Sequence, residues 1–335
     1  MKITLNPATC RSAMKPLSIV VFLDGRPGHE KQTNGIVQAI SAITPVKPVG
    51  TEVVQPSAVN LINKWVQYLF SSILPFAHGR NDQSADLVIG TGTHTHLPML
   101  LFKKNCIAAP RIVTCMTPDA LLLKHFDLCC IPRHDAPPVR KNIFKTLGPP
   151  NNVAFSTRHI PDRGLILVGG LDNKSHTWNS RSVVEQITNI IEMDRAVTWT
   201  LSSSPRTPPD ACQLLDEMAA GMEKVSFFRS TETPADWVEE QYALNAKVWV
   251  TGDSMSMIYE ALTAGCSVGV LPVQWKQRDN KFQTSIDLLT GKELVIEYEQ
   301  WLTGAAMEPL LQEPLNEAHR CAEEILRRWW PDRLP

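Results

Sequence analysis

The sequence predicts an α/β protein with two Rossmann-like, doubly wound domains that face a cleft. Short apolar runs rich in Val and Ile alternate with helix-length segments along the chain. This alternation is typical of parallel strands that are covered on both faces. The length of 335 residues exceeds what one hydrophobic core usually supports. Two sets of about six strands therefore indicate two domains.

The expected strands are short runs separated by segments long enough for one helix each. Those of the first half are Ser18–Leu23, Thr51–Val54, Asp86–Gly90, Arg111–Cys115, Asp127–Ile131 and Asn152–Phe155. Those of the second half are Gly164–Val168, Ala196–Leu201, Val225–Phe228, Lys247–Val250, Ser267–Leu271 and Leu294–Ile296. Runs of this length, bounded by polar segments, favour buried strands over helices.

The domain boundary is expected where a polar, proline-containing segment, 156–163, interrupts the pattern of strands. The first domain then covers 17–158 and the second covers 159–315, followed by a helix-like segment over 316–335. Residues 1–16 carry three basic residues and lack a continuous apolar core, so a secretory signal is disfavoured. We expect a disordered extension there, with a short transit peptide as the alternative.

Charge and composition exclude several classes of function. Lys plus Arg total 33 and Asp plus Glu total 34, which gives a formal net charge of −1. Because binding to nucleic-acid phosphates needs a basic face, no nucleic-acid partner is expected. The eight cysteines form no CxxC pair, which fits neither a zinc site nor a disulfide framework. A reducing, cytoplasmic location follows.

Membrane contact rests on one segment. No apolar run approaches the roughly 18 to 20 residues that span a bilayer. Residues 61–76, LINKWVQYLFSSILPF, have aromatic and aliphatic residues at helix-like intervals. They fit either an amphipathic surface helix that contacts lipid or a lipid-linked acceptor, or a buried helix of the domain. The first alternative would place the protein peripherally at the inner face of a membrane.

Ligands of doubly wound folds bind beyond the carboxyl ends of the strands, so the loops there are the candidate sites. The loop after the first strand contains Asp24, Gly28 and His29. Gly28 allows close approach of a ligand, and His29 can serve as a general base or hold a substrate hydroxyl. The alternative is a glycine-rich connector with a solvated histidine.

Further candidates follow the next strands of the first domain. Thr93, His94 and His96 suit hydrogen bonds to polyhydroxylated material, or they cap a helix. No third ligand with recognisable spacing accompanies the two histidines, so no metal site is expected. Asp119 and Asp135 are either bases or turn residues. His134 adjoins Asp135 and joins the acceptor-side candidates.

In the second domain, Gly169 and Gly170 follow a strand and offer backbone N–H groups at an expected helix start, which is an anion site. The pattern is not GxGxxG, so a nicotinamide cofactor is disfavoured and no cofactor is expected. The hydroxyls of Ser202 and Ser204, with Arg206 as a bidentate donor, suit a diphosphate. An ordinary serine-rich loop is the alternative.

The strongest local signal is the segment 248–265, in which a strand, a Gly-Asp-Ser turn and a helix follow one another. Ser254 suits the N-cap of that helix, with Asp253 in the turn before it. Glu260 lies roughly 9 Å farther along the helix axis. Its carboxylate can accept hydrogen bonds from both hydroxyls of a ribose, whereas a solvated glutamate is the alternative.

These blocks, in the same order, resemble the mitochondrial fission Elm family over the chain from Leu17 onward. The matching blocks are DGRPGHEKQTNG, LVIGTGTHTHLP, IPRHD, LVGG, SSSPRTP and VTGDSMSMIYEAL. Plant members of that family are associated with mitochondrial division, and bacterial members look like glycosyltransferases. The family is similar to the two-domain GT-B glycosyltransferases. The segment GDSMSMIYEALTAGCSVGVLP is similar to the donor-binding motif of the N-acetylglucosaminyltransferase of peptidoglycan lipid-intermediate synthesis.

The resemblance implies roles for individual residues. Glu260 matches the ribose-binding acid, and Ser254 with Met255 matches the helix start that faces the diphosphate. Gly169 and Gly170 match the glycine loop of the donor domain. Gly28-His29 matches the Gly-His of the acceptor loop, although DGRPGHE replaces a run of glycines. In many GT-B proteins the final helix crosses back onto the N-terminal domain, which here is the segment 316–335.

The expected function is therefore metal-independent transfer of a sugar from a nucleotide-sugar donor to a hydroxyl of a glycan or lipid-linked acceptor. Synthesis of surface polysaccharide, lipopolysaccharide or glycolipid is the setting that this implies. The base is His29, Asp24 or Asp119. Two alternatives stay open: a nucleotide-sugar 2-epimerase, and a non-catalytic adaptor of the mitochondrial-fission type on the same fold.

Overall fold

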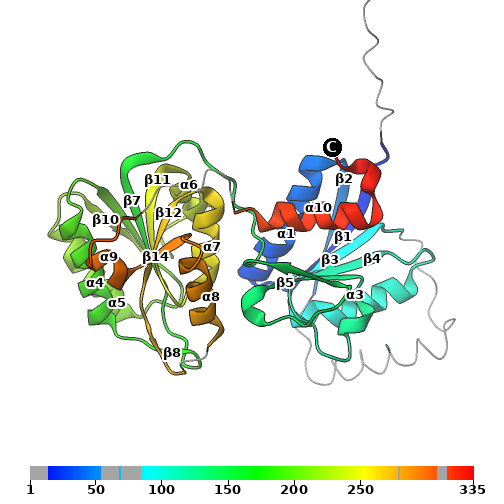
Figure 1. The fold of residues 1–335 in the computed structure, drawn as a ribbon, viewed down its shortest axis with the longest axis horizontal. Coiled ribbons are helices and arrows are strands. Elements are labelled where there is room, and N and C mark those ends of the chain that lie inside the picture. Colours follow the sequence, from blue (N-terminus) through cyan, green and yellow to red (C-terminus); the bar gives the residue numbers. More distant parts are fainter. Residues whose placement is uncertain (1–13, 54–67, 69–83, 278–279, 308–314) are drawn as a thin grey trace, which may run out of the picture. The chain divides into compact units, whose positions relative to one another are not determined.

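The computed structural model describes residues 14–53, 68, 84–277, 280–307 and 315–335. Contacts within the chain divide it into two compact units (Figure 1). Unit 1 comprises Met1–Cys130 and Ala318–Pro335, and unit 2 comprises Ile131–Glu317. Most of the expected segment 61–76 lies outside the described residues; Tyr68 is buried.

Two six-stranded sheets form the centres of the fold. The first has the spatial order β2 (Val46–Glu52), β1 (Leu17–Leu23), β3 (Leu87–Gly90), β4 (Arg111–Thr114), β5 (Leu128–Pro132) and β6 (Ile143–Thr146). The second has the order β10 (Val225–Phe228), β9 (Thr198–Ser203), β7 (Ile160–Val168), β11 (Asn245–Thr251), β12 (Ser267–Leu271) and β14 (Val295–Glu297). The prediction of two parallel, doubly wound α/β sheets is confirmed.

Helices connect these strands. They are α1 (Pro27–Ile43), α3 (Thr93–Asn105), α4 (Ser180–Met193), α5 (Pro209–Ala220), α6 (Trp237–Leu244), α7 (Met255–Ala264), α8 (Lys281–Thr290), α9 (Tyr298–Leu302) and α10 (Glu317–Trp329). Three short 3₁₀ turns are η1 (Leu123–His125), η2 (Arg133–Asp135) and η3 (Pro331–Arg333). A separate antiparallel ribbon pairs β8 (His176–Thr177) with β13 (Gln274–Trp275).

Alternating side chains of the second sheet enter two separate cores. Along β7, Leu165 and Leu167 join the core beneath α6, α7 and α8, whereas Ile166 and Val168 join the core beneath α4 and α5. Trp249, from β11, is almost fully buried in the latter core. Because successive side chains of a strand point to opposite faces, a continuous apolar run fits a sheet that is covered on both sides.

The structure differs from the predicted elements at three main places. Strand β2 covers Val46–Glu52, whereas Thr51–Val54 was predicted. Asn152–Phe155 is irregular, and β6 forms earlier in the chain. Pro149 and Pro150 have no N–H to donate to a ladder, and the Asn151 side chain bonds Thr263 Oγ1 (3.0 Å). The expected linker over 156–163 contains the start of β7.

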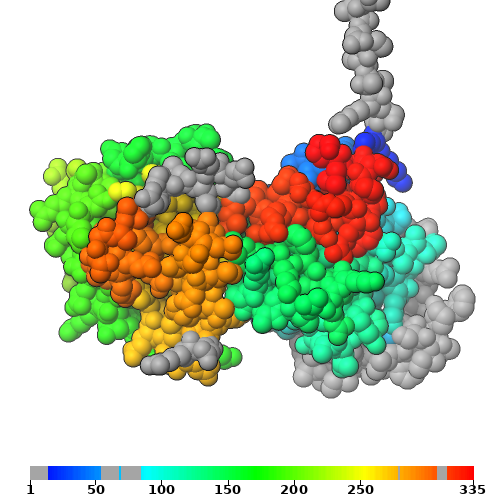
Figure 2. Space-filling model, viewed as in Figure 1, coloured from blue at the N-terminus to red at the C-terminus, as the bar shows by residue number. Residues whose placement is uncertain are grey.

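The C-terminal helix α10 belongs to unit 1. Its buried face includes Ile325 and Leu326. The following turn is fixed by Arg333, which donates to Thr44 Oγ1 (3.0 Å) and to the Lys15 carbonyl (2.9 Å). In Figure 2 this red segment lies against the blue residues near the start of β1. In the described part of the chain, no helix combines the length and apolarity that a membrane crossing requires.

Helix α7 is anchored through a buried tyrosine, and this anchor can be tested. The Tyr259 hydroxyl contacts the Leu147 carbonyl (3.2 Å) and Ser285 Oγ (2.8 Å), which lies on α8. Because removing the hydroxyl leaves buried polar groups without a partner, Tyr259→Phe should lower the free energy of unfolding by about 1–2 kcal/mol in urea titrations.

Two further variants check the interpretation. Ser285→Ala combined with Tyr259→Phe should cost clearly less than the sum of the two single changes, because the two hydroxyls are partners. Tyr298→Phe removes a hydroxyl that accepts a partly buried hydrogen bond from Asn189 (2.9 Å). This variant should lower the free energy of unfolding by less than Tyr259→Phe does. Strict additivity of the first pair would contradict the proposed anchor.

Candidate functional site

In each sheet the order of strands reverses at one position, and the loops at the carboxyl ends of the two strands there form the expected ligand site. In the first sheet this position lies between β1 and β3, and in the second it lies between β7 and β11. The loops concerned contain Asp24–His29 and Thr91–Thr95 in unit 1. In unit 2 they contain Gly169–Leu171 and Gly252–Ser254.

Unit 1 brings Asp24 and His29 together as a hydrogen-bonded pair. His29 Nδ1 lies 2.8 Å from Asp24 Oδ2, and the Asp24 side chain is fully shielded from solvent. The Arg26 N–H donates to the other carboxylate oxygen (3.2 Å). An ionised carboxylate only accepts hydrogen bonds, so Nδ1 donates to Asp24, and in the neutral imidazole Nε2 then has the lone pair. His29 is thus oriented as a proton acceptor.

Gly92 is the functional residue of this site that the sequence analysis missed. Its φ is +111°, and a Cβ at this position would lie 2.2 Å from Asp24 Oδ2 and 2.7 Å from His29 Nδ1. Any side chain would therefore separate the pair. The TGTH sequence signals a turn, but it does not reveal which side chains approach the glycine.

The other unit 1 candidates occupy different environments. Gly28 has open space where a Cβ would stand, so a ligand can approach its backbone. Thr93 is exposed and His94 is half-buried in the first turn of α3. His96 is buried, and its Nε2 lies 3.3 Å from Thr114 Oγ1 while its ring packs on Phe126. It is a core residue, contrary to its predicted contact with a ligand.

Asp119, His134 and Asp135 do not join the pair in unit 1. Asp119 is exposed, and its carbonyl accepts the N–H groups of the following turn. His134 and Asp135 belong to η2 in unit 2, where His134 stacks on Tyr259 and Asp135 accepts from Lys281 Nζ (3.5 Å). Burial lowers the pKa of His134. The sequence analysis placed His134 and Asp135 on the acceptor side from their position along the chain.

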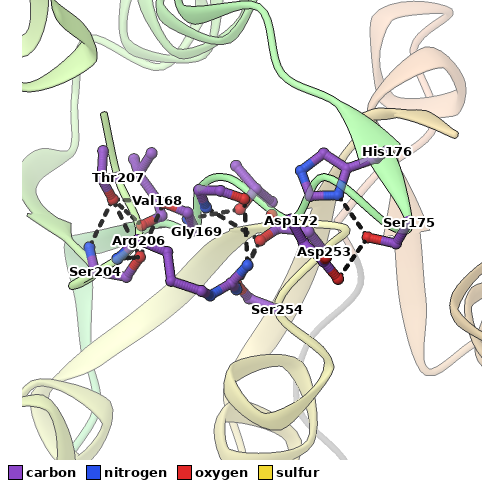
Figure 3. Close-up of polar contacts among 12 residues, drawn as sticks. Val168, Gly169, Asp172, Ser175, His176, Ser204, Arg206, Thr207, Asp253 and Ser254 are labelled. Atoms are coloured by element: carbon purple, nitrogen blue, oxygen red, sulfur yellow. Dashed lines mark hydrogen bonds and ion pairs between the residues drawn. The ribbon is translucent and has the colours of Figure 1, made fainter. Parts of the chain in front are cut away.

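In unit 2, charged and polar groups cluster around Arg206 (Figure 3). Its Nη2 donates to Asp253 Oδ2 (2.8 Å) and to Ser254 Oγ (3.3 Å), and its Nη1 donates to the Gly170 carbonyl (3.2 Å). The Arg206 side chain is 44% exposed, whereas that of Asp253 is 2% exposed. The cluster thus links the loops after β7, β9 and β11 and leaves part of the guanidinium open to solvent.

The predicted anion site at Gly169 and Gly170 is wrong in its details. The Gly169 N–H donates to Thr251 Oγ1 (2.7 Å), and the Gly170 N–H donates to Asp253 Oδ2 (3.1 Å). No helix starts there, because α4 begins at Ser180. Both N–H groups are already satisfied by side chains from the neighbouring strand, which lies more than eighty positions away in the sequence.

The predicted serines support the loops. Ser204 Oγ donates to the Gly169 carbonyl (2.9 Å), and Ser202 Oγ donates to the Ser203 carbonyl (3.3 Å). Both are buried. Thr207, which the sequence analysis did not single out, bonds the carbonyls of Gly169 and Val168. These hydroxyls therefore position the loop that carries Arg206, and the structure gives no sign that they grip a ligand.

Helix α7 begins as predicted, with Ser254 at its N-cap position, but the serine hydroxyl makes no capping bond. It donates to Asp253 Oδ2 instead (3.3 Å). Met255 is buried in the core. Glu260 is 4% exposed, so it is not a solvated glutamate. Burial and the neighbouring Glu260 carboxylate raise the pKa of Tyr242.

Within the described ranges, no group of three or more His, Cys, Asp or Glu side chains is arranged to hold a metal ion.

The neutral state of His96 can be tested by pH. Burial and the nearby His29 lower the pKa of His96 to about 4. The unfolded chain then binds one more proton between about pH 6.5 and pH 4. The stability that His96 contributes is complete above this window and is lost as the pH falls through it. Between pH 7 and pH 4.5 the loss should be about 2–3 kcal/mol.

His96→Gln keeps a polar group near Thr114 Oγ1 and removes the titration. Urea titrations at both pH values should show a smaller loss of stability in this variant than in the wild type. An equal loss in the two proteins would show that His96 titrates normally in the folded state.

The fold matches solved structures of nucleotide-sugar enzymes at low identity. The UDP-GlcNAc 2-epimerase from Methanocaldococcus jannaschii has a TM-score of 0.56 at 14% identity, covering 94% of this chain and 99% of that one. The putative UDP-N-acetylglucosamine 2-epimerase from Listeria monocytogenes has a TM-score of 0.53 at 13% identity, covering 93% of this chain and 95% of that one. The glycosyltransferase SnogD from Streptomyces nogalater has a TM-score of 0.47 at 12% identity, covering 93% of this chain and 96% of that one.

Among curated proteins, none matches this sequence significantly. The family model described as Mitochondrial fission ELM1 matches residues 27–329. This range includes His29, Gly92, Arg206 and Asp253 of the two sites, and Asp24 precedes it. The chain therefore belongs to the mitochondrial fission ELM1 family.

Proposed function

We propose that the chain is a glycosyltransferase that moves a sugar from a nucleotide-sugar donor to an acceptor hydroxyl without a metal ion. The observation that carries this proposal is the half-exposed Arg206 beside the N-terminus of α7, at the point where the order of the second sheet reverses. This is where a doubly wound domain binds its ligand. The two epimerases named above share the fold with this chain, and the proposed donor is of the kind that they are named for.

The diphosphate of the donor is proposed to bind at Arg206. A guanidinium presents five N–H donors in a planar fork that matches phosphate oxygens. The first turn of α7 adds the positive end of a helix dipole, and Ser254 does not cap it. Arg206 also neutralises the charge that develops on the leaving diphosphate. Glu260 is proposed to accept the ribose hydroxyls, as the family resemblance implies.

His29 is proposed as the general base. Its Nε2 takes the proton of the acceptor hydroxyl, while that oxygen forms a bond to the anomeric carbon of the sugar. The bond from this carbon to the phosphate oxygen breaks, and the electron pair leaves with the nucleoside diphosphate. Asp24 keeps the ring oriented and stabilises the imidazolium that forms. The acceptor is proposed to be a glycan or a lipid-linked hydroxyl compound, met in the cytoplasm or at the inner face of a membrane.

Binding of the diphosphate can be measured by thermal unfolding with UDP, GDP or ADP and with the corresponding sugar nucleotides. At least one nucleotide should raise the unfolding temperature, and Arg206→Ala should abolish most of that rise, since a charge-assisted contact is lost. Glu260→Gln should also reduce the nucleotide-dependent rise of the unfolding temperature. Each shift is compared with the unfolding temperature of the same variant without nucleotide, because Arg206 also neutralises buried Asp253.

Arg195→Ala is the matched control. Arg195 is an exposed arginine of unit 2 at the opposite end of the sheet, between α4 and β9. Its loss should leave the nucleotide-dependent shift unchanged. If no nucleotide stabilises the wild type, the donor proposal fails and the non-catalytic adaptor becomes the better explanation.

The role of His29 can be tested separately from donor binding. His29→Ala should keep the affinity for the nucleotide and lower turnover by about 10²- to 10⁴-fold, the usual contribution of a general base. Asp24→Asn should lower turnover too, because the ring is no longer held in the productive tautomer. His125→Ala, an exposed histidine of the same unit, serves as the control. Unchanged turnover in His29→Ala would remove this residue from the mechanism.

A second candidate function is epimerisation at C2 of the sugar, which is favoured by the solved epimerases of the same fold. The two reactions differ in what they need. An epimerase converts the nucleotide sugar alone, whereas a transferase needs an acceptor. Incubation of labelled donor without acceptor, followed by separation of the products, distinguishes them: accumulation of the C2 epimer would exclude the transferase proposal.

A further inference from the structure

The ribbon of β8 and β13 contains a buried histidine that the proposed reaction does not use. His176 is 2% exposed and pairs across the ribbon with Trp275. Its ring lies 5.8 Å from the ring of Trp275 and 6.1 Å from that of Trp178. A polar ring among aromatic side chains needs hydrogen-bond partners to offset the cost of burial.

A short relay fixes the protonation of this ring. The Ser175 hydroxyl donates its only proton to Asp172 Oδ2 (2.9 Å), and its oxygen lies 2.9 Å from His176 Nδ1. Hydrogen bonds from the Lys174 N–H and from Ser175 lower the pKa of Asp172, so this carboxylate is ionised and only accepts. Ser175 must therefore accept from Nδ1–H. In the neutral imidazole, Nε2 of His176 then carries the lone pair.

That lone pair has no partner among the residues that the structure describes. The same holds for one oxygen of the Arg206–Asp253 cluster: Asp253 Oδ2 takes all the contacts, and buried Oδ1 takes none from the described residues. Leaving a buried acceptor unpaired is costly. Two such acceptors at one edge of the sheet indicate a ligand that donates hydrogen bonds.

Trp275 connects the two acceptors in space. Its Cζ2 lies 3.6 Å from the position that a Cβ on Gly252 would occupy, and Gly252 immediately precedes Asp253. Trp275 also packs against the ring of His176. Figure 3 shows the His176 relay and the Asp253–Arg206 pair beside the same loop, the one that follows β7.

We propose that the region beneath the ribbon binds the sugar ring of the donor, with His176 Nε2 and Asp253 Oδ1 accepting its hydroxyls. This inference rests on the proposed function and extends it from the diphosphate to the sugar. A phosphate does not fit these atoms, because its oxygens are themselves acceptors and Asp253 would repel its charge. Hydroxyls supply the missing donors, and aromatic rings suit the apolar face of a pyranose.

Entry of the sugar requires the ribbon to move, since both acceptors are buried. The ribbon pairs only two residues on each side, Thr177 with Gln274 and His176 with Trp275. One further backbone bond, from the Lys276 N–H to the Ser175 carbonyl (3.0 Å), extends it. Side chains hold it as well: Trp275 Nε1 donates to Gln283 Oε1 (2.8 Å), and Lys276 Nζ donates to the Asn173 carbonyl (2.7 Å). Entry of the ligand therefore requires these few contacts and the backbone bonds to open and form again.

Calorimetric titration of the full chain with UDP and with UDP-N-acetylglucosamine tests the proposal. His176→Asn keeps an amide N–H near Ser175 but has no atom at the position of Nε2. We expect it to bind UDP-N-acetylglucosamine about tenfold more weakly than the wild type and UDP within twofold of the wild type. His176→Gln, whose amide oxygen reaches the position of Nε2, should recover most of the loss.

Other outcomes separate the two levels of the proposal. If His176→Asn weakens UDP and UDP-N-acetylglucosamine equally, or weakens neither, the sugar site is refuted while the donor site at Arg206 stands. If the wild type binds neither these two ligands nor UDP-glucose, GDP-mannose or ADP-glucose, both proposals fall. Thermal unfolding of each variant shows that it is folded.

The protonation of His176 can be read without any ligand. Long-range ¹⁵N–¹H correlation of the histidine side chains should show His176 protonated at Nδ1 and unprotonated at Nε2 at neutral pH, and Ser175→Ala should disturb this state. A wild-type ring protonated at Nε2 alone would refute the relay and with it the acceptor role.

Discussion

The ion pair between Arg206 and Asp253 holds together the loops at the carboxyl ends of the strands in unit 2. Three loops meet through it, because Asp253 also takes the Gly170 N–H and Arg206 also reaches the Gly170 carbonyl. A buried carboxylate is tolerated only when it is paired and hydrogen-bonded. Asp253 meets this condition through one oxygen. The second oxygen, buried and without a partner among the described residues, is therefore a feature that a ligand would explain.

Unit 1 has a similar arrangement, in which a buried carboxylate contacts a histidine instead of an arginine. Asp24 is buried at the end of β1 and orients the partly exposed His29, as Asp253 orients the partly exposed Arg206 at the end of β11. In each unit a shielded carboxylate holds a basic side chain at the position where the order of the sheet reverses. An imidazole is a side chain that can accept and donate a proton, and a guanidinium is one that pairs with anions, so the two sites suit acid–base chemistry and anion binding, respectively.

Much of this could be predicted from the sequence, and the failures have physical causes. Buried parallel strands appear in the sequence as apolar runs, so the fully buried strand β12 is predicted with its observed bounds. The strands β8 and β13 have two residues each and leave no such pattern. The sequence marks His29 and His96 alike, yet one lies on a loop beside Asp24 and the other packs on Phe126 in the core. Only the packing of the chain separates them.

The glycine pair after β7 shows how a correct motif leads to an incorrect contact. A strand followed by two glycines suggests backbone donors for a phosphate. Here side chains from the neighbouring strand take both N–H groups. In the proposed donor site the phosphates are bound by Arg206, whose charge is already shared with Asp253. A guanidinium that is already paired with a carboxylate binds a diphosphate less strongly than free backbone N–H groups with an unpaired cation would. In this proposal the sugar therefore has to supply part of the binding affinity. The unpaired acceptors of His176 and Asp253 are placed to provide it.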